Sequence, residues 1–210
     1  VLGITGKTAY FGLDLAKLKK GETVLISAAA GAVGNVAGQI AKIYGCKVIG
    51  ITSSDEKANW LINELGFDAV VNYKNNNFVK DLRKLCPEKV DVYFDNVGGR
   101  IFESVLFAMN NFGRIICCGA VSQYDQAAPE SGPRGVPGLI VTKRLTLRGF
   151  IVMDFEDRKK EAEKQLMDWI EKKQIKPAED IVIGLQNTPN ALIGLLNGDN
   201  KGKRMVRINK

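Results

Sequence analysis

Apolar and polar positions follow two periods along the first part of the chain, one typical of buried strands and one typical of helices. Residues 23–28 are apolar apart from Ser27, and such a run indicates a strand covered on both faces, as in a parallel sheet. Residues 7–18 have the spacing of an amphipathic helix, which we expect to end at Lys-Lys-Gly, residues 19–21, because glycine stops helices. The next segments predict a βαβαβ unit: a helix over 33–44, a strand over 47–52, a helix over 55–65 and a strand over 69–72.

The same alternation returns in the middle of the chain, where it predicts a helix over 78–85, a strand over 91–95, a helix over 100–109, and strands over 113–118 and 145–150. Two such halves make an α/β fold, a Rossmann doubly wound parallel sheet of six strands with helices on both faces. Its ligand crevice lies at the carboxyl ends of the strands. Residues 123–138 are rich in Pro, Gly, Ser and Ala, and we expect a loop there, at a functional edge.

The last part of the chain follows a different pattern. It predicts a charged helix over 157–173, a short strand over 181–185, a helix over 189–196 and a final strand over 204–208. We therefore divide the chain into a connecting helix (1–20), a dinucleotide-binding domain (21–150) and a C-terminal segment (151–210).

Composition narrows the possible functions. The 210 residues include no histidine, which excludes Ser-His and Cys-His dyads and the commonest metal ligand. Cys46, Cys86, Cys117 and Cys118 form no CxxC pair, so we expect reduced, buried thiols in a cytoplasmic protein. No apolar run is long enough to cross a bilayer, so we expect no membrane partner.

The net charge of +7 comes from basic residues that are scattered among acidic ones. They lack aromatic interleaving and accompany no nucleic-acid-binding motif, so we expect no nucleic-acid partner and favour a polyanionic small ligand.

The turn after the first strand carries candidate chemistry. Residues 27–34 are Ser-Ala-Ala-Ala-Gly-Ala-Val-Gly, a variant of the dinucleotide fingerprint in which Ala29 replaces the first glycine. Small residues let the backbone approach a pyrophosphate, and the following helix offers free N–H groups and the positive end of its dipole. The same residues also suit a tight turn that packs Gly34 and Gly38 against the strand, and we expect both interpretations to hold.

The end of the second predicted strand bears on the choice between NAD and NADP. An NAD site has an acidic residue there, but this chain has Thr52-Ser53-Ser54. Hydroxyls accommodate a 2′-phosphate, and Lys57 can bring a positive charge to it; the spacing favours equally a solvated surface lysine. We interpret Ser53 and Glu56 as a capping box at the start of the next helix.

Taken together, the motifs resemble a known family. They are SAAAGAVG at 27–34, GQIAK at 38–42, SDEK at 54–57, LGFD at 65–68, NYK at 72–74, FDNVGG at 94–99, FGRI at 112–115, CGAVSQY at 118–124 and GDNKGK at 198–203. This combination, which runs through the whole chain, resembles the zinc-independent medium-chain dehydrogenases/reductases, in their prostaglandin/leukotriene and alkenal double-bond reductase branch. The resemblance implies an N-terminal GroES-like barrel that would form the other wall of the active site. We therefore expect a segment before Val1, against which residues 151–210 would pack.

The resemblance also implies roles for individual residues. The pyrophosphate of NADPH would be held by Gly31, Ala32, Val33 and Gly34, and its 2′-phosphate would lie at Ser53, Lys57 and Tyr73. Asn96 would lie along the cofactor, and the surface beneath the nicotinamide and its ribose would come from Cys118, Gly119, Ala120, Val121, Ser122 and Tyr124. That wall would continue through Phe150, Ile151 and Val152, and Asn200 would reach the carboxamide end.

The resemblance further implies a reaction, the NADPH-dependent reduction of the activated C=C bond of an enal or enone. Tyr124 would be the catalytic residue, donating a hydrogen bond or proton toward the carbonyl oxygen. We expect no metal, because residues 3–6, where zinc-dependent relatives carry a cysteine ligand, are Gly-Ile-Thr-Gly. Quinone reduction and a non-catalytic NADPH-binding module remain alternatives. The strand over 145–150 would be a sheet edge, which favours a homodimer.

Overall fold

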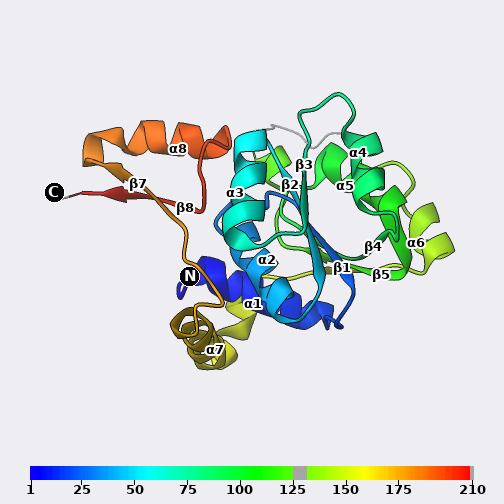
Figure 1. Ribbon diagram of the computed structural model, residues 1–210, viewed down its shortest axis with the longest axis horizontal. Helices are drawn as coiled ribbons and strands as arrows, with labels where there is room; N and C mark the ends of the chain where they lie inside the picture. Colours follow the sequence, from blue (N-terminus) through cyan, green and yellow to red (C-terminus); the bar gives the residue numbers. More distant parts are fainter. Residues whose placement is uncertain (125–131, 209–210) are drawn as a thin grey trace.

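The computed structural model describes residues 1–124 and 132–208, and its centre is one parallel six-stranded sheet (Figure 1). The strands are β1 (Thr23–Ile26), β2 (Lys47–Thr52), β3 (Ala69–Asn72), β4 (Val90–Asp95), β5 (Met109–Cys117) and β6 (Thr146–Gly149). They lie in the order β3-β2-β1-β4-β5-β6. The chain therefore switches direction across the sheet between β1 and β4, where an open α/β sheet forms its crevice. The predicted Rossmann fold is confirmed.

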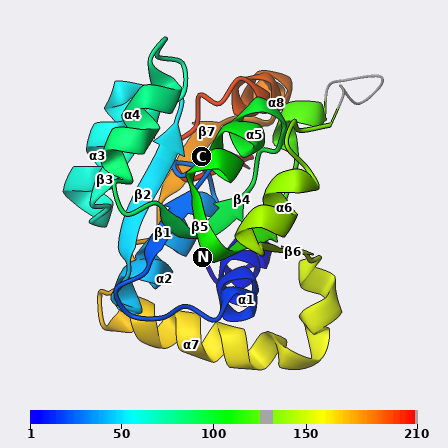
Figure 2. The ribbon, with the colours of Figure 1, turned by 90° about the vertical axis from the view of Figure 1, so that its right-hand side faces the viewer.

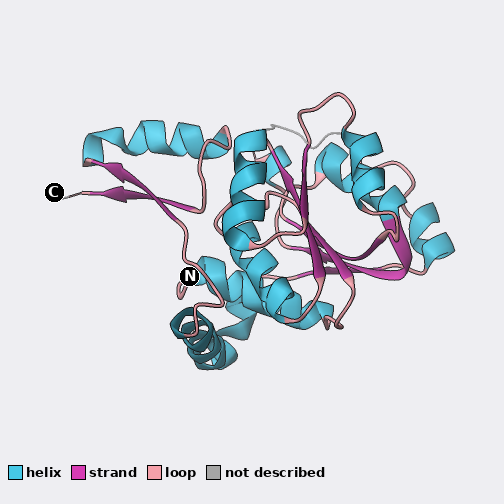
Figure 3. Cartoon of the chain, viewed as in Figure 1, coloured by secondary structure: helices cyan, strands magenta, loops and turns pink. Residues whose placement is uncertain are grey.

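Helices cover both faces of this sheet, as Figures 1 and 3 show. The helices of the domain are α1 (Ile4–Ala16), α2 (Gly34–Ile43), α3 (Asp55–Leu65), α4 (Phe78–Leu85), α5 (Gly99–Ala108) and α6 (Gly138–Lys143). Val24 and Ile26 of β1 pack with α1, α2 and α3, whereas Leu25 between them packs with α4 and α5. Because side chains alternate across a strand, one short apolar run supplies both hydrophobic cores.

The predicted boundaries agree with the structure where capping signals are local. Helix α3 spans the predicted residues, with Ser54 at its N-cap and Gly66 in the left-handed region at its C-cap. Helix α1, however, begins three residues earlier than expected and ends at Lys17, which itself adopts a left-handed conformation with φ of 50°. The prediction that Gly21 stops this helix is wrong, because Gly21 lies in the turn that leads to β1.

The predicted loop over 123–138 lies partly outside the described residues, since 125–131 are not described. Its far end was predicted incompletely, because α6 begins at Gly138. Strand β5 begins at Met109, directly after α5, and is thus longer than the predicted strand over 113–118.

The C-terminal segment contains two parts. A 3₁₀ turn (Val152–Arg158) leads into α7 (Lys159–Glu171), in place of the single helix predicted over 157–173. Further on, β7 (Glu179–Ile183), α8 (Thr188–Leu196) and β8 (Lys203–Arg207) form an arm in which β7 and β8 pair in parallel, separately from the main sheet. Figure 1 shows this arm projecting from the domain.

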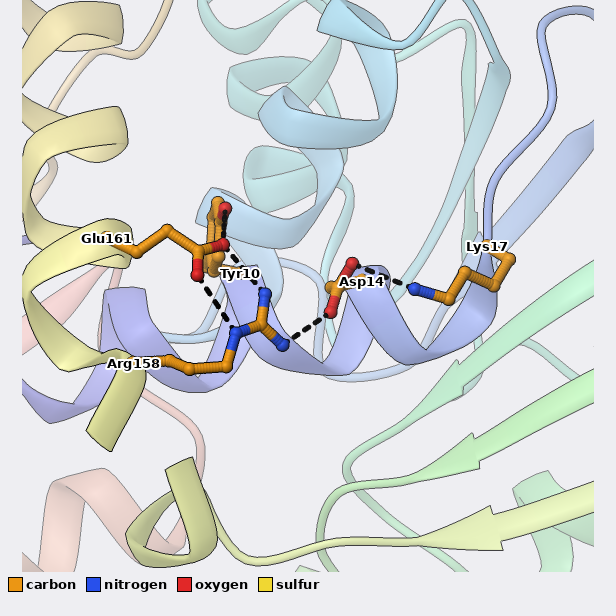
Figure 4. A network of polar contacts seen from close by, with 5 residues as sticks. All are labelled: Tyr10, Asp14, Lys17, Arg158 and Glu161. Atoms are coloured by element: carbon orange, nitrogen blue, oxygen red, sulfur yellow. Dashed lines mark hydrogen bonds and ion pairs between the residues drawn. The ribbon is translucent and has the colours of Figure 1, made fainter. Parts of the chain in front are cut away.

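Helix α7 crosses α1 and packs against it (Figure 2), and a polar network links the two helices (Figure 4). The guanidinium of Arg158 donates to the carboxylates of Asp14, at 3.0 Å, and Glu161, at 2.7 Å. The hydroxyl of Tyr10 donates to Glu161 at 2.9 Å, and Lys17 pairs with Asp14 at 3.2 Å. These contacts join the C-terminal segment to the helix that precedes the sheet.

Among residues 1–124 and 132–208, no helix combines the length and the apolar character needed to cross a membrane.

Candidate functional site

A cleft of about 1920 Å³ lies along the carboxyl edge of the sheet, at the point where the strand order reverses. Its walls come from the turn after β1, the ends of β2 and β3, the starts of α4 and α5, and residues 195–200 of the arm. The predicted site residues that line it are Gly31, Ala32, Val33, Gly34, Ser53, Lys57, Tyr73, Asn96, Val121, Ser122, Tyr124 and Asn200. Residues from separate parts of the chain thus meet where the sequence predicted a ligand crevice.

The turn between β1 and α2 is built for close backbone approach. Ala28 adopts a φ of 47°, and the N–H of Gly31 donates to its carbonyl at 2.9 Å. A Cβ at Gly34 would lie 2.4 Å from that same oxygen, so only glycine fits. Gly38 is also enclosed. We predicted that it would pack against the strand, but its neighbour is the ring of Phe67. Since α2 begins at Gly34, which lines the cleft, the N-terminus of the helix lies at this turn.

The start of α3 corrects the predicted capping box. The N-cap is Ser54, whose hydroxyl accepts a hydrogen bond from the N–H of Lys57 at 3.3 Å. Ser53 is therefore not the cap; it lies in the cleft wall. Glu56 does not close a capping box either, because its carboxylate pairs with Lys201.

Lys57 is not a solvated surface lysine, because it is only 7% exposed. Its ammonium group donates to the carbonyl of Gly198. Burial lowers the pKa of Lys57 below its ordinary value of 10.5, and the neighbouring charges of Arg204 and Lys74 act in the same direction, while Asp199 and Glu56 oppose them. An anion placed here would gain from a cation that is desolvated and held in position.

The side chains that line the cleft carry a net positive charge. Among the described residues that line it, the cationic ones outnumber the single carboxylate, that of Glu103. They are Lys57, Lys74, Lys80, Arg83, Lys84, Arg100 and Arg134. Tyr73, which lies next to Lys74, is 40% exposed in the same wall. The arrangement suits a ligand with several negative charges.

A buried carboxylate organises the turn after β4, and the sequence analysis did not identify it. Asp95 is 2% exposed and accepts hydrogen bonds from the hydroxyls of Ser27 (2.8 Å) and Tyr93 (2.6 Å). It also accepts from the backbone N–H groups of Val97 and Gly98. Burial and the adjacent carboxylate raise the pKa of Tyr93, which keeps its hydroxyl a donor. An acidic residue at the end of a buried strand, in the sequence Phe94-Asp95-Asn96, was the signal that could have identified it.

Asn96 is held by this network at the bottom of the cleft. Its backbone N–H donates to the hydroxyl of Ser27 at 2.9 Å, and its side-chain amide donates to the carbonyl of Ser27 at 2.7 Å. The ends of β1 and β4 are thereby joined on the cleft side.

The segment that follows β5 lies against the same turn. Cys118 and Gly119 donate backbone N–H groups to the carbonyl of Asp95, and the hydroxyl of Ser122 donates to Val97 at 2.6 Å. Tyr124 ends a 3₁₀ turn (Val121–Gln123) and is 65% exposed in the cleft wall.

Some predicted site residues lie outside the cleft lining, namely Cys118, Gly119, Ala120, Phe150, Ile151 and Val152. The ring of Phe150 packs toward the core beside Phe155, with 6.3 Å between ring centroids. Ile151 is 59% exposed. The cleft is thus formed without these residues.

The arm supplies one wall of the cleft, of which the sequence analysis predicted only Asn200. This residue is 6% exposed, and its amide donates to the carbonyl of Gly202 at 2.8 Å. Gly202 in turn pairs with Gly31 of the turn after β1. Asn200 therefore lies beside the phosphate turn, and Leu195, Leu196 and Asn197 extend the same wall.

The four cysteines are free, and two of them, Cys46 and Cys86, are buried as predicted, whereas Cys117 and Cys118 are half-buried. Burial raises the pKa of Cys46, Cys86 and Cys117 to about 11 and that of Cys118 to about 12, so all are thiols at neutral pH. In the described part of the chain, no three Cys, Asp or Glu side chains gather in a way that could hold a metal ion.

Comparison with known proteins extends these observations. The family model described as zinc-binding dehydrogenase matches residues 32–172. The chain is 49% identical to a putative NADP-dependent oxidoreductase, YfmJ, of Bacillus subtilis, over 99% of this chain and 62% of the relative. It is 46% identical to prostaglandin reductase 1 of Bos taurus, over 98% of this chain and 63% of the relative.

Among solved structures, CurA of Vibrio vulnificus in complex with NADPH matches with a TM-score of 0.95 and 40% identity, over 100% of this chain and 64% of that chain. The chain thus spans less than two thirds of the length of each of these relatives.

Proposed function

The chain belongs to the zinc-binding dehydrogenase family, in its zinc-independent medium-chain dehydrogenase/reductase branch, and on this basis we propose that it is the NADPH-binding part of a reductase. The proposed reaction is reduction of the activated C=C bond of an α,β-unsaturated aldehyde or ketone. The names of its relatives, a prostaglandin reductase and an NADP-dependent oxidoreductase, support this reaction class.

The observation that carries the proposal is the cationic, hydroxylated pocket at the end of β2. Lys57 is buried there, with the Ser53 hydroxyl and Tyr73 in the same wall. The position that holds a carboxylate in NAD sites is occupied by Ser53. A 2′-phosphate therefore meets positive charge and hydrogen-bond donors and no anionic fork.

In this proposal the remaining predicted residues bind the rest of the cofactor. Gly31 to Gly34 hold the pyrophosphate with backbone N–H groups, Asn96 lies along the cofactor, and residues 118–124 form the surface beneath its nicotinamide and ribose. Residues 150–152 continue that surface, and Asn200 closes the cleft from the arm. When bound, NADPH supplies the hydride, while the protein aligns the reacting carbon atoms and excludes water.

Tyr124 is the catalytic residue of the proposal. The hydroxyl of a tyrosine can donate a hydrogen bond or proton to the carbonyl oxygen of the substrate as negative charge develops there. Its exposure in the cleft wall supports this role, because a substrate can reach it.

Two measurements test the proposal. Titration of the chain with NADPH and NADH, followed by nicotinamide fluorescence, should give tighter binding of NADPH by about tenfold to a hundredfold, the value of one charge-assisted hydrogen bond of roughly 1.5–3 kcal/mol. Equal or tighter binding of NADH would overturn it.

In the full-length protein, Tyr124→Phe should lower turnover of an alkenal while the affinity for NADPH stays the same. Turnover of quinones alone would favour a quinone reductase, and binding without any turnover would favour a non-catalytic NADPH-binding module.

We further propose that the arm and residues 151–158 pack on a preceding barrel domain. The exposed apolar side chains there support this proposal: Ile151, Met153, Ile181, Ile183, Leu185, Leu192 and Ile193. Strand β6, which ends the sheet, would pair with a second copy of the chain to form a homodimer. The four free thiols support a cytoplasmic location.

A further inference from the structure

The segment 197–202 connects α8 to β8 and crosses the domain where the 2′-phosphate would lie; we call it the C-terminal clasp. The N–H of Gly202 donates to the carbonyl of Ala30 at 2.8 Å, and Gly202 pairs with Gly31 in an isolated parallel bridge. The clasp is thus hydrogen-bonded to the phosphate turn itself.

The clasp also reaches the first turn of α3 at two points. The carbonyl of Gly198 accepts from the ammonium group of Lys57, and a Cβ at Gly198 would lie 3.7 Å from the Ser53 hydroxyl. Three residues further along the clasp, Lys201 pairs with the carboxylate of Glu56. One short segment therefore lies against three residues around the start of α3, namely Ser53, Glu56 and Lys57.

Glu56 places a carboxylate at the edge of this pocket, exposed and outside the cleft lining. It directly precedes Lys57, and the two charges are close enough for Glu56 to influence the pKa of Lys57. A free carboxylate at this position would repel a dianionic 2′-phosphate and would also offer Lys57 a competing partner. The ammonium group of Lys201 cancels that charge, and the hydrogen bond to Lys201 lowers the pKa of Glu56.

We propose that Lys201 is a specificity-determining residue for the phosphorylated cofactor, acting from the C-terminal clasp by neutralising Glu56 beside the 2′-phosphate pocket. The inference rests on the proposed function, since it concerns the same pocket. Lys201 lies far along the chain and outside the cleft lining. In this proposal it sets the net charge beside the turn between β2 and α3.

The experiment uses two ligands that isolate the adenosine half of the cofactor. Isothermal titration gives the affinity of the chain for 2′,5′-ADP, which carries the 2′-phosphate, and for 5′-AMP, which does not. The variants are Lys201→Met, Glu56→Gln and the double variant. Lys164→Met, an exposed lysine on α7 away from the cleft lining, is the matched control for loss of one positive charge.

Lys201→Met should weaken 2′,5′-ADP by roughly threefold to tenfold, as expected for one uncompensated charge acting on a dianion near the surface. The affinity for 5′-AMP should be unchanged, and Lys164→Met should change neither. The double variant should recover the wild-type affinity for 2′,5′-ADP, because removal of Glu56 removes the repulsion. The loss should shrink at high salt.

The inference would be overturned if Lys201→Met left the ratio of the two affinities unchanged. It would also be overturned if the double variant stayed as weak as Lys201→Met, because Lys201 would then act on the phosphate directly or through the fold. Failure of the proposed function is a separate result: wild-type chain would then bind 2′,5′-ADP no more tightly than 5′-AMP.

Discussion

Replacement of Asp95 tests whether the buried network at the end of β4 holds the cleft together. Oδ1 of Asp95 accepts from Ser27, Tyr93, Val97 and Gly98, whereas Oδ2 accepts from Gly98 alone. In Asp95→Asn, the amide nitrogen therefore fits best at the Oδ2 position, where it faces one N–H. The expected cost is about 1–3 kcal/mol, the loss from one buried donor left without an acceptor.

Asp95→Ala removes the acceptor from all four donors. If two of them find no new partner, the free energy of unfolding should fall by about 2–6 kcal/mol. The backbone of Asn96 depends on Ser27, which this substitution leaves free to move. We therefore expect weaker NADPH binding as well as lower stability.

The assay is urea unfolding followed by circular dichroism at pH 7, with NADPH titration in parallel. The expected order of stability is wild type, Asp95→Asn, then Asp95→Ala. Asp154→Ala, at an exposed position in the C-terminal segment, serves as the control and should behave as wild type. A stability of Asp95→Ala within about 1 kcal/mol of the wild type would refute the reasoning, because even two donors without partners should cost about 2 kcal/mol or more.

Three further predictions concern the phosphate turn and its surroundings. Gly34→Ala should weaken NADPH binding about tenfold or more in a fluorescence titration. The added Cβ would lie 2.4 Å from the carbonyl oxygen of Ala28 and would displace the backbone of the turn that lines the cleft. An unchanged affinity would mean that the turn adapts to the added methyl group. Gly38→Ala should lower the free energy of unfolding by about 1–3 kcal/mol, measured with urea, since its Cβ would lie 2.0 Å from the ring of Phe67; Gly38→Ala with wild-type stability would contradict this packing. Because burial lowers the pKa of Lys57, the free protein loses that proton below pH 10.5, so the affinity for 2′,5′-ADP should fall as pH rises through the lowered pKa. Lys57→Arg should abolish this fall in a pH series, and a persisting fall would assign it to another group.

How far the candidate site was predictable depends on the range of the interactions that form it. The turn after β1 is a continuous segment, so its small residues predicted a tight turn at the ligand crevice, and the structure places that turn in the cleft lining. Lys57 was left equally consistent with a surface lysine, because its burial comes from Gly198, which lies far along the chain. Asp95 was overlooked for a similar reason, since one of its partners is Ser27, in the turn after β1.

Adjacent residues of similar chemistry also limited the sequence analysis. Ser53 and Ser54 can each cap a helix, and the pattern favoured Ser53 with Glu56. In the structure β2 continues to Thr52, and Tyr73 donates its N–H to the Thr52 carbonyl, which leaves Ser54 at the start of α3. Strand pairing therefore decided which serine caps the helix and which lies in the cleft wall.

The sequence by itself determined the order of helices and strands, the doubly wound sheet and the position of the phosphate turn, because hydrophobic periodicity and turn residues act over a few neighbouring positions. Only the tertiary structure decided that the C-terminal clasp lies on that turn, that Lys201 pairs with Glu56 and that Lys57 is buried. These contacts join residues more than 140 positions apart, and no local pattern records them, since they form only after the sheet has brought the two segments together.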